Sequence, residues 1–266
     1  MFVICATAQE PQTVITFQAG NYKFSVLSEG GRQGNSNLLK GATDEQLKKY
    51  LPDGTFPLGT HAFLVQTPDN NILIDAGYGK LLFQNLKSLK LDETKIHIIL
   101  LTHMHGDHIG GLLKDGKTAF PNAKLYLSKK EHDYWMNLGE RGATQQNVLN
   151  AYKSVLHLLE PYDIDNQGEG IKRCAGIIPI AAYGHTPGHT AYYLKDANWL
   201  IWGDLTHAMP IQMPCPEVAL SFDVDAAKAI ESRKKILKHI VQNGVTVSGM
   251  HIPFPAVGKI KEATEG

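Results

Sequence analysis

The segment Thr102–Gly111 constrains this chain more than any other, because it concentrates metal-binding side chains directly after an apolar run. Three histidines and one aspartate fall within six consecutive positions of it: His103, His105, Asp107 and His108. Burying such side chains without partners is costly, since each unsatisfied polar group costs about 2–7 kcal/mol. Imidazole nitrogen and carboxylate oxygen together suit zinc and neighbouring metals. The fold must therefore let this loop converge on a divalent metal ion.

Further ligands must come from other segments, because four residues do not complete two metal sites. Three candidates also follow apolar runs. His189 ends a Gly-His-Thr-Pro-Gly-His segment, Asp204 follows Trp-Leu-Ile-Trp-Gly, and His251 follows Val-Thr-Val-Ser-Gly-Met. Loops at one end of a sheet can converge on a common point. Each residue alone would more often be structural, but the set predicts a metal centre. His185 precedes the Thr-Pro-Gly turn, and we expect it to shape that loop.

The pattern of apolar residues predicts strands and helices in mixed order. Strands are expected over 61–67, 71–75, 95–101, 124–127, 177–182, 191–194, 199–202 and 245–248. Helices are expected from Ser128, over 145–159 and over 226–242. Ser128 and Glu131 have the spacing of a capping box. Tight turns between strands, mixed with helices, favour an α/β sandwich over a purely parallel sheet. The stretch 137–170 suits an insertion that caps a pocket.

Composition excludes several classes of protein. Lys+Arg and Asp+Glu both number 26, so the net charge is zero and the basic excess typical of nucleic-acid binding is missing. No apolar run approaches the roughly 18 residues that span a bilayer. The three cysteines have no CxxC spacing and are expected as free thiols. We expect residues 1–266 to form a single domain.

The first eight residues, Met1–Ala8, are apolar and end in Ala-x-Ala. They resemble the tail of a signal peptide that is cleaved after Ala8. An ordinary N-terminal strand is the alternative. The signal-peptide interpretation favours a periplasmic or secreted protein over a cytoplasmic one.

On these motifs the chain resembles the metallo-β-lactamase superfamily over about residues 61–254. The resemblance implies an α/β fold, an αββα sandwich with metals at one edge. It implies two divalent ions, with zinc favoured and Mn, Co or Fe as alternatives. The first metal would be held by His103, His105 and His189, and the second by Asp107, His108 and His251. Asp204 would bridge both, and Asp107 and Asp204 would be the catalytic carboxylates.

Asp75 lies in a Leu-Ile-Asp-Ala-Gly segment and matches an acidic position of this family. The resemblance implies that it orients a metal-binding histidine, as partners outside the ligand set commonly do. A carboxylate that caps a turn is the alternative.

Four stretches resemble one branch of the superfamily, which holds acyl-homoserine lactonases and methyl-parathion-hydrolase-like phosphotriesterases: 63–77, 203–216, 222–235 and 251–255. The segment 203–207 lacks the cysteine of dinuclear β-lactamases, and no basic cluster suggests glutathione. The branch implies a dinuclear hydrolase that uses a metal-bound hydroxide to open lactones of the acyl-homoserine-lactone type. The alternatives are a phosphotriesterase or aryl esterase of the methyl-parathion-hydrolase type and a non-catalytic metal-binding module.

The expected partner is a small ester-like molecule in a neutral, apolar pocket. Four residues are candidates for its wall because they lie near the motifs in sequence: Trp135, His207, Met209 and Phe254. Packing in the core is the alternative for Trp135, Met209 and Phe254. A homodimer is compatible with this interpretation.

Overall fold

The structure is a computed structural model that describes residues 12–174 and 176–262. The expectation of a signal-peptide remnant falls on Met1–Ala8, which lies outside the described residues. Among the helices of the described ranges, none combines the length and the apolar character that crossing a membrane requires.

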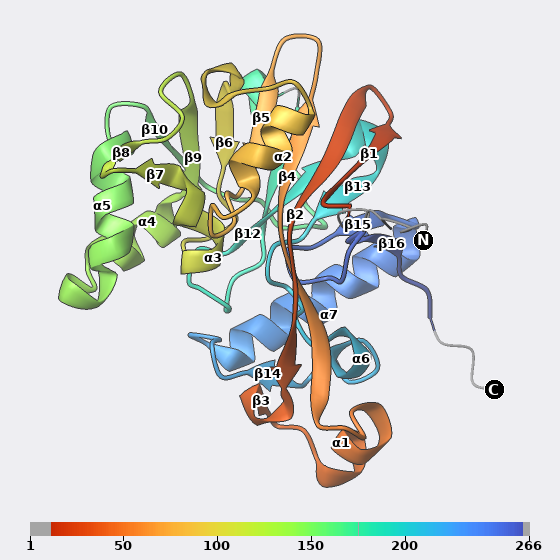
Figure 1. The fold of residues 1–266 in the computed structure, drawn as a ribbon. Helices are drawn as coiled ribbons and strands as arrows, with labels where there is room; N and C mark the ends of the chain where they lie inside the picture. Colours follow the sequence, from red (N-terminus) through yellow and green to blue (C-terminus); the bar gives the residue numbers. More distant parts are fainter. Residues whose placement is uncertain (1–11, 175, 263–266) are drawn as a thin grey trace, which may run out of the picture.

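Two β-sheets form the centre of the fold (Figure 1). The larger has the order β1-β2-β4-β5-β6-β9-β10. Its strands are β1 Val14–Ala19, β2 Tyr22–Asn35, β4 Thr55–Gln66, β5 Asn71–Ile74, β6 Ile98–Leu100, β9 Lys124–Ser128 and β10 Leu156–Leu159. The smaller has the order β11-β12-β13-β15-β16. Its strands are β11 Ile178–Ala181, β12 Thr190–Leu194, β13 Trp199–Ile201, β15 Thr246–Ser248 and β16 Val257–Lys259.

Helices and two small strand pairs surround these sheets (Figure 1). The helices are α1 Asp44–Tyr50, α2 Leu82–Ser88, α3 Gly106–Ile109, α4 Lys129–Met136, α5 Ala143–Tyr152, α6 Met209–Gln212 and α7 Ala226–Asn243. The small pairs join β3 Leu39–Lys40 to β14 Ala219–Leu220 and β7 Leu113–Lys114 to β8 Lys117–Thr118.

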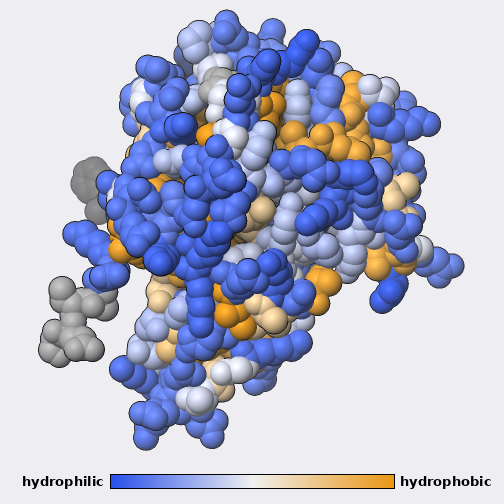
Figure 2. Space-filling view, turned by 180° about the vertical axis from the view of Figure 1, so that it is seen from behind, coloured by the Kyte–Doolittle hydropathy of each residue, from blue (hydrophilic) through white to orange (hydrophobic). Residues whose placement is uncertain are grey.

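Buried apolar side chains divide the core into layers. Alternate side chains of the larger sheet face α2, α4 and α5 on one side and the smaller sheet on the other. Helix α7 covers the outer face of the smaller sheet through Ile236 and Ile240. The layers are therefore helices, sheet, sheet and helix, the αββα sandwich expected from the sequence. Figure 2 shows the molecule from behind relative to Figure 1, and this face is mostly hydrophilic. This agrees with a core in which apolar side chains lie inside.

Local sequence explains where α7 begins and ends. The Asp225 side chain accepts a hydrogen bond from the backbone N–H of Lys228 at 3.0 Å, which caps the first turn. Gly244 ends the helix at φ 59°, in the left-handed conformation that glycine adopts readily. This confirms the predicted helix over 226–242. The segment just before Asp225 also contributes to the site.

Strands β2 and β4 extend well beyond the rest of their sheet and carry α1 at their far end (Figure 1). Phe56 and Leu58 of β4 are buried there against Leu51, which follows α1, and against Ile211 of α6. The apolar pattern over 61–67 predicted only part of β4, and β1 and β2 were not predicted.

Two expectations about the middle of the chain are wrong. The predicted helix over 145–159 ends at Tyr152, and residues 156–159 instead form β10, which pairs in parallel with β9. The stretch 137–170 does not cap the site, because its residues Val148, Leu149 and Tyr152 are buried in the core beside the larger sheet. The apolar stripe therefore reflects core packing on a helix and then a strand.

Candidate metal centre

Loops from both sheets bring histidine and aspartate side chains to one edge of the sandwich. The loop after β6 and the start of α3 carry the Thr102–Gly111 motif. The loops after β11, β13 and β15 carry His185, Asp204 and His251. In the described part of the chain, three groups have ligand atoms within 4.8 Å of one another. They are His103, His105, His185 and Asp204; Asp107, His108 and His251; and Asp204, His207 and His251.

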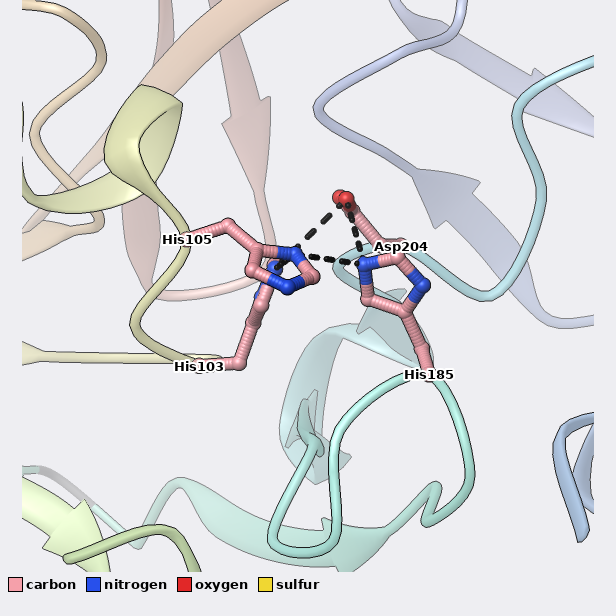
Figure 3. Close-up of side chains that lie close together, drawn as sticks. All are labelled: His103, His105, His185 and Asp204. Atoms are coloured by element: carbon pink, nitrogen blue, oxygen red, sulfur yellow. Dashed lines mark hydrogen bonds and ion pairs between the residues drawn. The ribbon is translucent and has the colours of Figure 1, made fainter. Parts of the chain in front are cut away.

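In the first group, three imidazoles and a carboxylate surround one point (Figure 3). The Nε2 atoms of His103 and His185 lie 3.0 and 2.9 Å from Nδ1 of His105. Asp204 Oδ2 lies 3.3 Å from His185 Nε2 and 3.6 Å from His103 Nε2. Three imidazoles and a carboxylate are a donor set that suits a divalent ion such as zinc.

Asp204 also reaches the second group. Its Oδ1 lies 3.1 Å from His108 Nε2, and its Oδ2 lies 3.1 Å from His251 Nε2. Asp107 Oδ2 lies 3.5 Å from His251 Nε2. The two carboxylate oxygens of Asp204 thus contact both groups, which is the geometry that a bridging carboxylate needs.

The structure corrects the expected position of His189. Its Nδ1 lies 2.8 Å from the carbonyl oxygen of Ala182, and its Nε2 accepts a hydrogen bond of 2.9 Å from the backbone N–H of Asp204. Both ring nitrogens are therefore engaged with backbone groups, and His189 belongs to none of the three groups. His185, which we expected to shape the loop, occupies the place in the first group instead. His189 positions the backbone of Asp204.

Hydrogen bonds at the far ring nitrogen orient several of these histidines. His108 Nδ1 lies 2.7 Å from Asp75 Oδ2, and His185 Nδ1 lies 2.8 Å from Asp223 Oδ1. His251 Nδ1 lies 2.9 Å from the carbonyl oxygen of Gly59. Such partners fix the tautomer and leave Nε2 free to face a metal. Asp75 lies where the sequence placed it, whereas the sequence did not predict the role of Asp223.

Asp75 also holds the start of the Thr102–Gly111 motif. Its Oδ1 accepts from the backbone N–H of Thr102 at 2.8 Å, and its Oδ2 accepts from the hydroxyl of Thr102 at 2.6 Å. Burial raises the pKa of Asp75, against the opposing effect of His108 and Thr102. The alternative of a turn-capping carboxylate does not fit a side chain that binds a histidine ring.

Glu131 is a buried carboxylate that joins two ligand loops, and the sequence did not predict this role. Its Oε1 accepts from the backbone N–H of Met104 at 3.0 Å. Its Oε2 accepts from the hydroxyl of Thr186 at 2.7 Å and from the backbone N–H of Gly188 at 3.0 Å. Trp135 Nε1 donates to Oε1 at 2.6 Å. The predicted capping box is therefore wrong, because Ser128 makes no capping bond and Glu131 points into the protein.

Burial sets the protonation state of most histidines in the first group. It lowers the pKa of His105 to about 3 and that of His103 well below its ordinary value. Burial also disfavours the charged form of His185, but the carboxylates of Asp204 and Asp223 raise its pKa to about 9. Metal ligands must be neutral imidazoles, so the low pKa values of His103 and His105 suit binding.

Among the buried side-chain atoms of the centre that lack a hydrogen bond, two face each other. His108 Nε2 and Asp204 Oδ1 make no hydrogen bond with any described group, although they lie only 3.1 Å apart. Unsatisfied buried polar atoms are costly, and a cation between the groups would satisfy both. The donor set and these two atoms fit divalent metal ions.

A cavity of about 280 Å³ opens onto the centre. Six of its lining residues belong to the three groups: His105, Asp107, His185, Asp204, His207 and His251. Of the four candidate pocket residues, His207 lines it. Trp135 and Met209 do not, because Trp135 packs in the core with its ring 5.9 Å from that of His105, and Met209 packs behind the smaller sheet. Phe254 lines a neighbouring cavity.

The remaining walls come from segments that sequence proximity did not suggest. They are Arg32 of β2, Tyr78 after β5 and Phe222 before α7, while Gly106 of the Thr102–Gly111 motif completes the lining. The lining carries charged side chains such as Arg32, so the expectation of a neutral pocket is wrong, although Tyr78 and Phe222 give it an aromatic part. For Arg32, the local sequence offered one signal of a role at the site, which is its position directly after the glycine pair Gly30-Gly31.

A family model of the Metallo-beta-lactamase superfamily matches residues 55–246. Among curated proteins, the chain is 32% identical over 155 residues to the uncharacterized protein YobT of Bacillus subtilis (strain 168). That match covers 56% of this chain and 62% of YobT, so the chain spans less than two thirds of that relative.

Two solved structures match nearly the whole chain. One is the hydrolase AbOPH of the beta lactamase superfamily, with a TM-score of 0.83, 30% identity, and coverage of 96% of this chain and 95% of that one. The other is AidC, a dizinc quorum-quenching lactonase in complex with a product, N-hexnoyl-L-homoserine. Its TM-score is 0.82, with 27% identity and 95% coverage of both chains.

Proposed function

The chain belongs to the metallo-beta-lactamase superfamily and is a metal-dependent hydrolase, and from this premise we propose that it opens lactones of the acyl-homoserine-lactone type with two divalent ions. The observation that carries the proposal is the cavity of about 280 Å³, whose floor is formed by the groups that share Asp204. Zinc is the metal we propose, because the donors are mainly imidazoles.

The first ion would be held by His103, His105 and His185, and the second by Asp107, His108 and His251. Asp204 would bind both. Bound divalent cations lower the pKa of water toward about 7 and polarise a carbonyl oxygen, which supplies the nucleophile and the electrophile of ester hydrolysis.

The side chains around the cavity have separate tasks. His207 Nε2 lies 3.0 Å from Asp204 Oδ2 and holds that carboxylate in place. Asp107 is only partly buried and lines the cavity, so its carboxylate could take the proton that the attacking water gives up and pass it to the leaving alkoxide. Burial and the charge of Asp107 raise the pKa of Tyr78, which keeps its hydroxyl protonated as a donor for a carbonyl oxygen.

Lactones suit this arrangement better than other esters for a chemical reason. Ring opening leaves the alkoxide tethered beside the second group, where Asp107 can protonate it. The similarity to AidC, a lactonase, supports the same substrate class. A phosphotriesterase or aryl esterase is the alternative, because the same centre would activate water toward any ester-like group.

A substrate panel tests the proposal. The zinc-loaded protein would be assayed with an acyl-homoserine lactone, an aliphatic lactone, an aryl ester, paraoxon and a cephalosporin. We expect the highest kcat/KM for a lactone, lower activity on the ester or paraoxon, and negligible activity on the cephalosporin. Asp204→Asn is the control for hydrolysis that does not depend on the centre. A much higher kcat/KM for paraoxon than for every lactone would replace the lactonase proposal with the phosphotriesterase one.

A further inference from the structure

We propose that Arg32 makes this site selective for ester or lactone substrates that carry a carboxylate near the scissile carbonyl. The inference rests on the proposed metal-dependent opening of lactones or esters and narrows the substrate class. A lactone or ester that bears a carboxylate should be a better substrate than a neutral acyl-homoserine lactone. It concerns only the wall of the cavity and not the residues that would hold metal.

Arg32 is the one lining residue with a formal positive charge that is independent of histidine protonation. It lies on β2 and its side chain is exposed. In the described part of the chain, its guanidinium takes part in no ion pair and no hydrogen bond. An arginine that is held at a binding cavity without a protein partner is free to pair with a ligand.

The carboxylates nearest to this wall have other partners. Glu29 accepts from the backbone N–H groups of Tyr78 at 2.7 Å and of Leu81 at 3.0 Å, and so braces the loop before α2. Asp107 lies 3.9 Å from His108 Nε2 and 3.5 Å from His251 Nε2. Neither carboxylate lies within ion-pair distance of Arg32, so its charge is available inside the cavity.

A bulge in β2 separates Glu29 from Arg32. The pairing of β2 with β4 shifts register between Ser28 and Gly31, where Gly30 adopts φ 103°. Bulges redirect side chains and often lie beside active sites. Here the bulge lets one short stretch of strand brace the Tyr78 loop with Glu29 and line the cavity with Arg32.

Arg32 also lines a second cavity of about 520 Å³, which it shares with Leu58, Leu81 and Phe254. That lining contains no carboxylate, and the two carboxylates of the first cavity, Asp107 and Asp204, lie beside histidine rings. A guanidinium between two cavities, with no carboxylate of the described residues within ion-pair distance, matches a ligand carboxylate through two parallel N–H···O bonds. A neutral lactone with an alkyl chain offers no group that would use it.

The test compares two p-nitrophenyl esters of equal chain length and identical leaving group, the neutral pentanoate and the acidic monoglutarate. Wild type, Arg32→Gln and Lys80→Gln would be assayed in the zinc-loaded state. Lys80 is the matched control, because its ammonium is exposed, lies 5.1 Å from the centre of the Tyr78 ring and does not line the cavity.

We expect wild type and Lys80→Gln to prefer the monoglutarate by about tenfold in kcat/KM, equivalent to about 1.4 kcal/mol. In Arg32→Gln the ratio should fall to about one. A wild-type ratio near one, or a preference that persists in Arg32→Gln because the carboxylate binds metal, overturns the inference.

A binding measurement separates this inference from the proposed function. If neither ester nor any lactone is hydrolysed, the proposed function fails, and calorimetry with glutarate and pentanoate then decides the role of Arg32. Glutarate should bind wild type about tenfold more tightly than Arg32→Gln, with no such difference for pentanoate. Equal binding of glutarate to both proteins rejects the inference.

Discussion

At the scale of single residues, two histidines in one loop have different roles. His185 and His189 are four positions apart, and both follow a glycine in the Gly-His-Thr-Pro-Gly-His segment. His185 Nε2 faces His105 and Asp204, whereas both ring nitrogens of His189 form hydrogen bonds with backbone groups. Hydrogen bonding, not residue type, therefore decides which of them is available to a metal.

Substituting each histidine in turn tests this assignment. His185→Ala should weaken metal binding by more than the roughly 10–100-fold that partners outside the ligand set contribute. His189→Ala should mainly lower stability, by about 1–3 kcal/mol, because it leaves the Asp204 N–H and the Ala182 carbonyl unsatisfied. Metal affinity by chelator competition and thermal unfolding measure the two effects. A larger loss of metal in His189→Ala than in His185→Ala would show that His189 is the metal ligand, as the sequence analysis expected.

Asp204 and His207 make a second matched pair. The carboxylate of Asp204 contacts both groups, whereas the His207 ring bonds to Asp204 through Nε2 and stacks on the His251 ring. Asp204→Ala should therefore abolish most activity and reduce metal content, whereas His207→Ala should retain metal and lose less activity. Metal analysis together with kcat/KM on a lactone checks this order, and the reverse order would show that the loop after β13 is wrongly assigned.

At the scale of elements, α4 connects two loops that approach from different sheets. Glu131 contacts Met104, between His103 and His105, and also Thr186 and Gly188, beside His185. The approach is close, since a Cβ on Gly188 would lie 2.1 Å from the backbone nitrogen of Glu131. A buried carboxylate with four donors can set the separation of two loops because it tolerates little displacement of any of them.

Glu131→Gln tests this positioning role. The amide keeps the shape of the side chain but turns an NH₂ group toward donors, so one pair of hydrogen bonds is lost. We expect metal affinity to fall by about 10–100-fold while the circular dichroism spectrum stays that of a folded protein. Glu140→Gln is the matched control, because Glu140 is exposed. Unchanged metal affinity in Glu131→Gln would show that α4 does not position the loops.

At the scale of the whole molecule, the centre joins the two sheets. Its residues follow β6 of the larger sheet and β11, β13 and β15 of the smaller one. A cation bound there would link loops that are distant in sequence and would favour only the folded state, where the loops are together.

Metal removal should therefore affect stability as well as activity. We expect about two divalent ions per chain in the loaded protein, and a lower Tm and no hydrolysis after chelation. Native mass spectrometry, differential scanning calorimetry and add-back of zinc measure this. Full activity in metal-stripped protein would reject the proposed mechanism, and one ion per chain would reject the dinuclear centre.

Much of this protein follows from its sequence alone. The periodicity of apolar residues predicted most strands of both sheets and α7, because a buried strand or helix face needs apolar side chains wherever it lies. The clustering in Thr102–Gly111 predicted a metal centre for a similar reason, since so many polar side chains in a buried loop need a cation. These inferences depend only on neighbours within one segment.

Other features were decided only by tertiary structure, because they depend on contacts between distant segments. Glu131 has the spacing of a capping residue, yet three of its four hydrogen-bond partners lie 27 to 57 positions away. The choice of His185 over His189 depends on which backbone groups surround each ring. Arg32, Tyr78 and Phe222 meet at one cavity although they come from β2, the loop after β5 and the segment before α7. No local sequence pattern predicts that these residues come together, since each one resembles an ordinary surface side chain within its own segment.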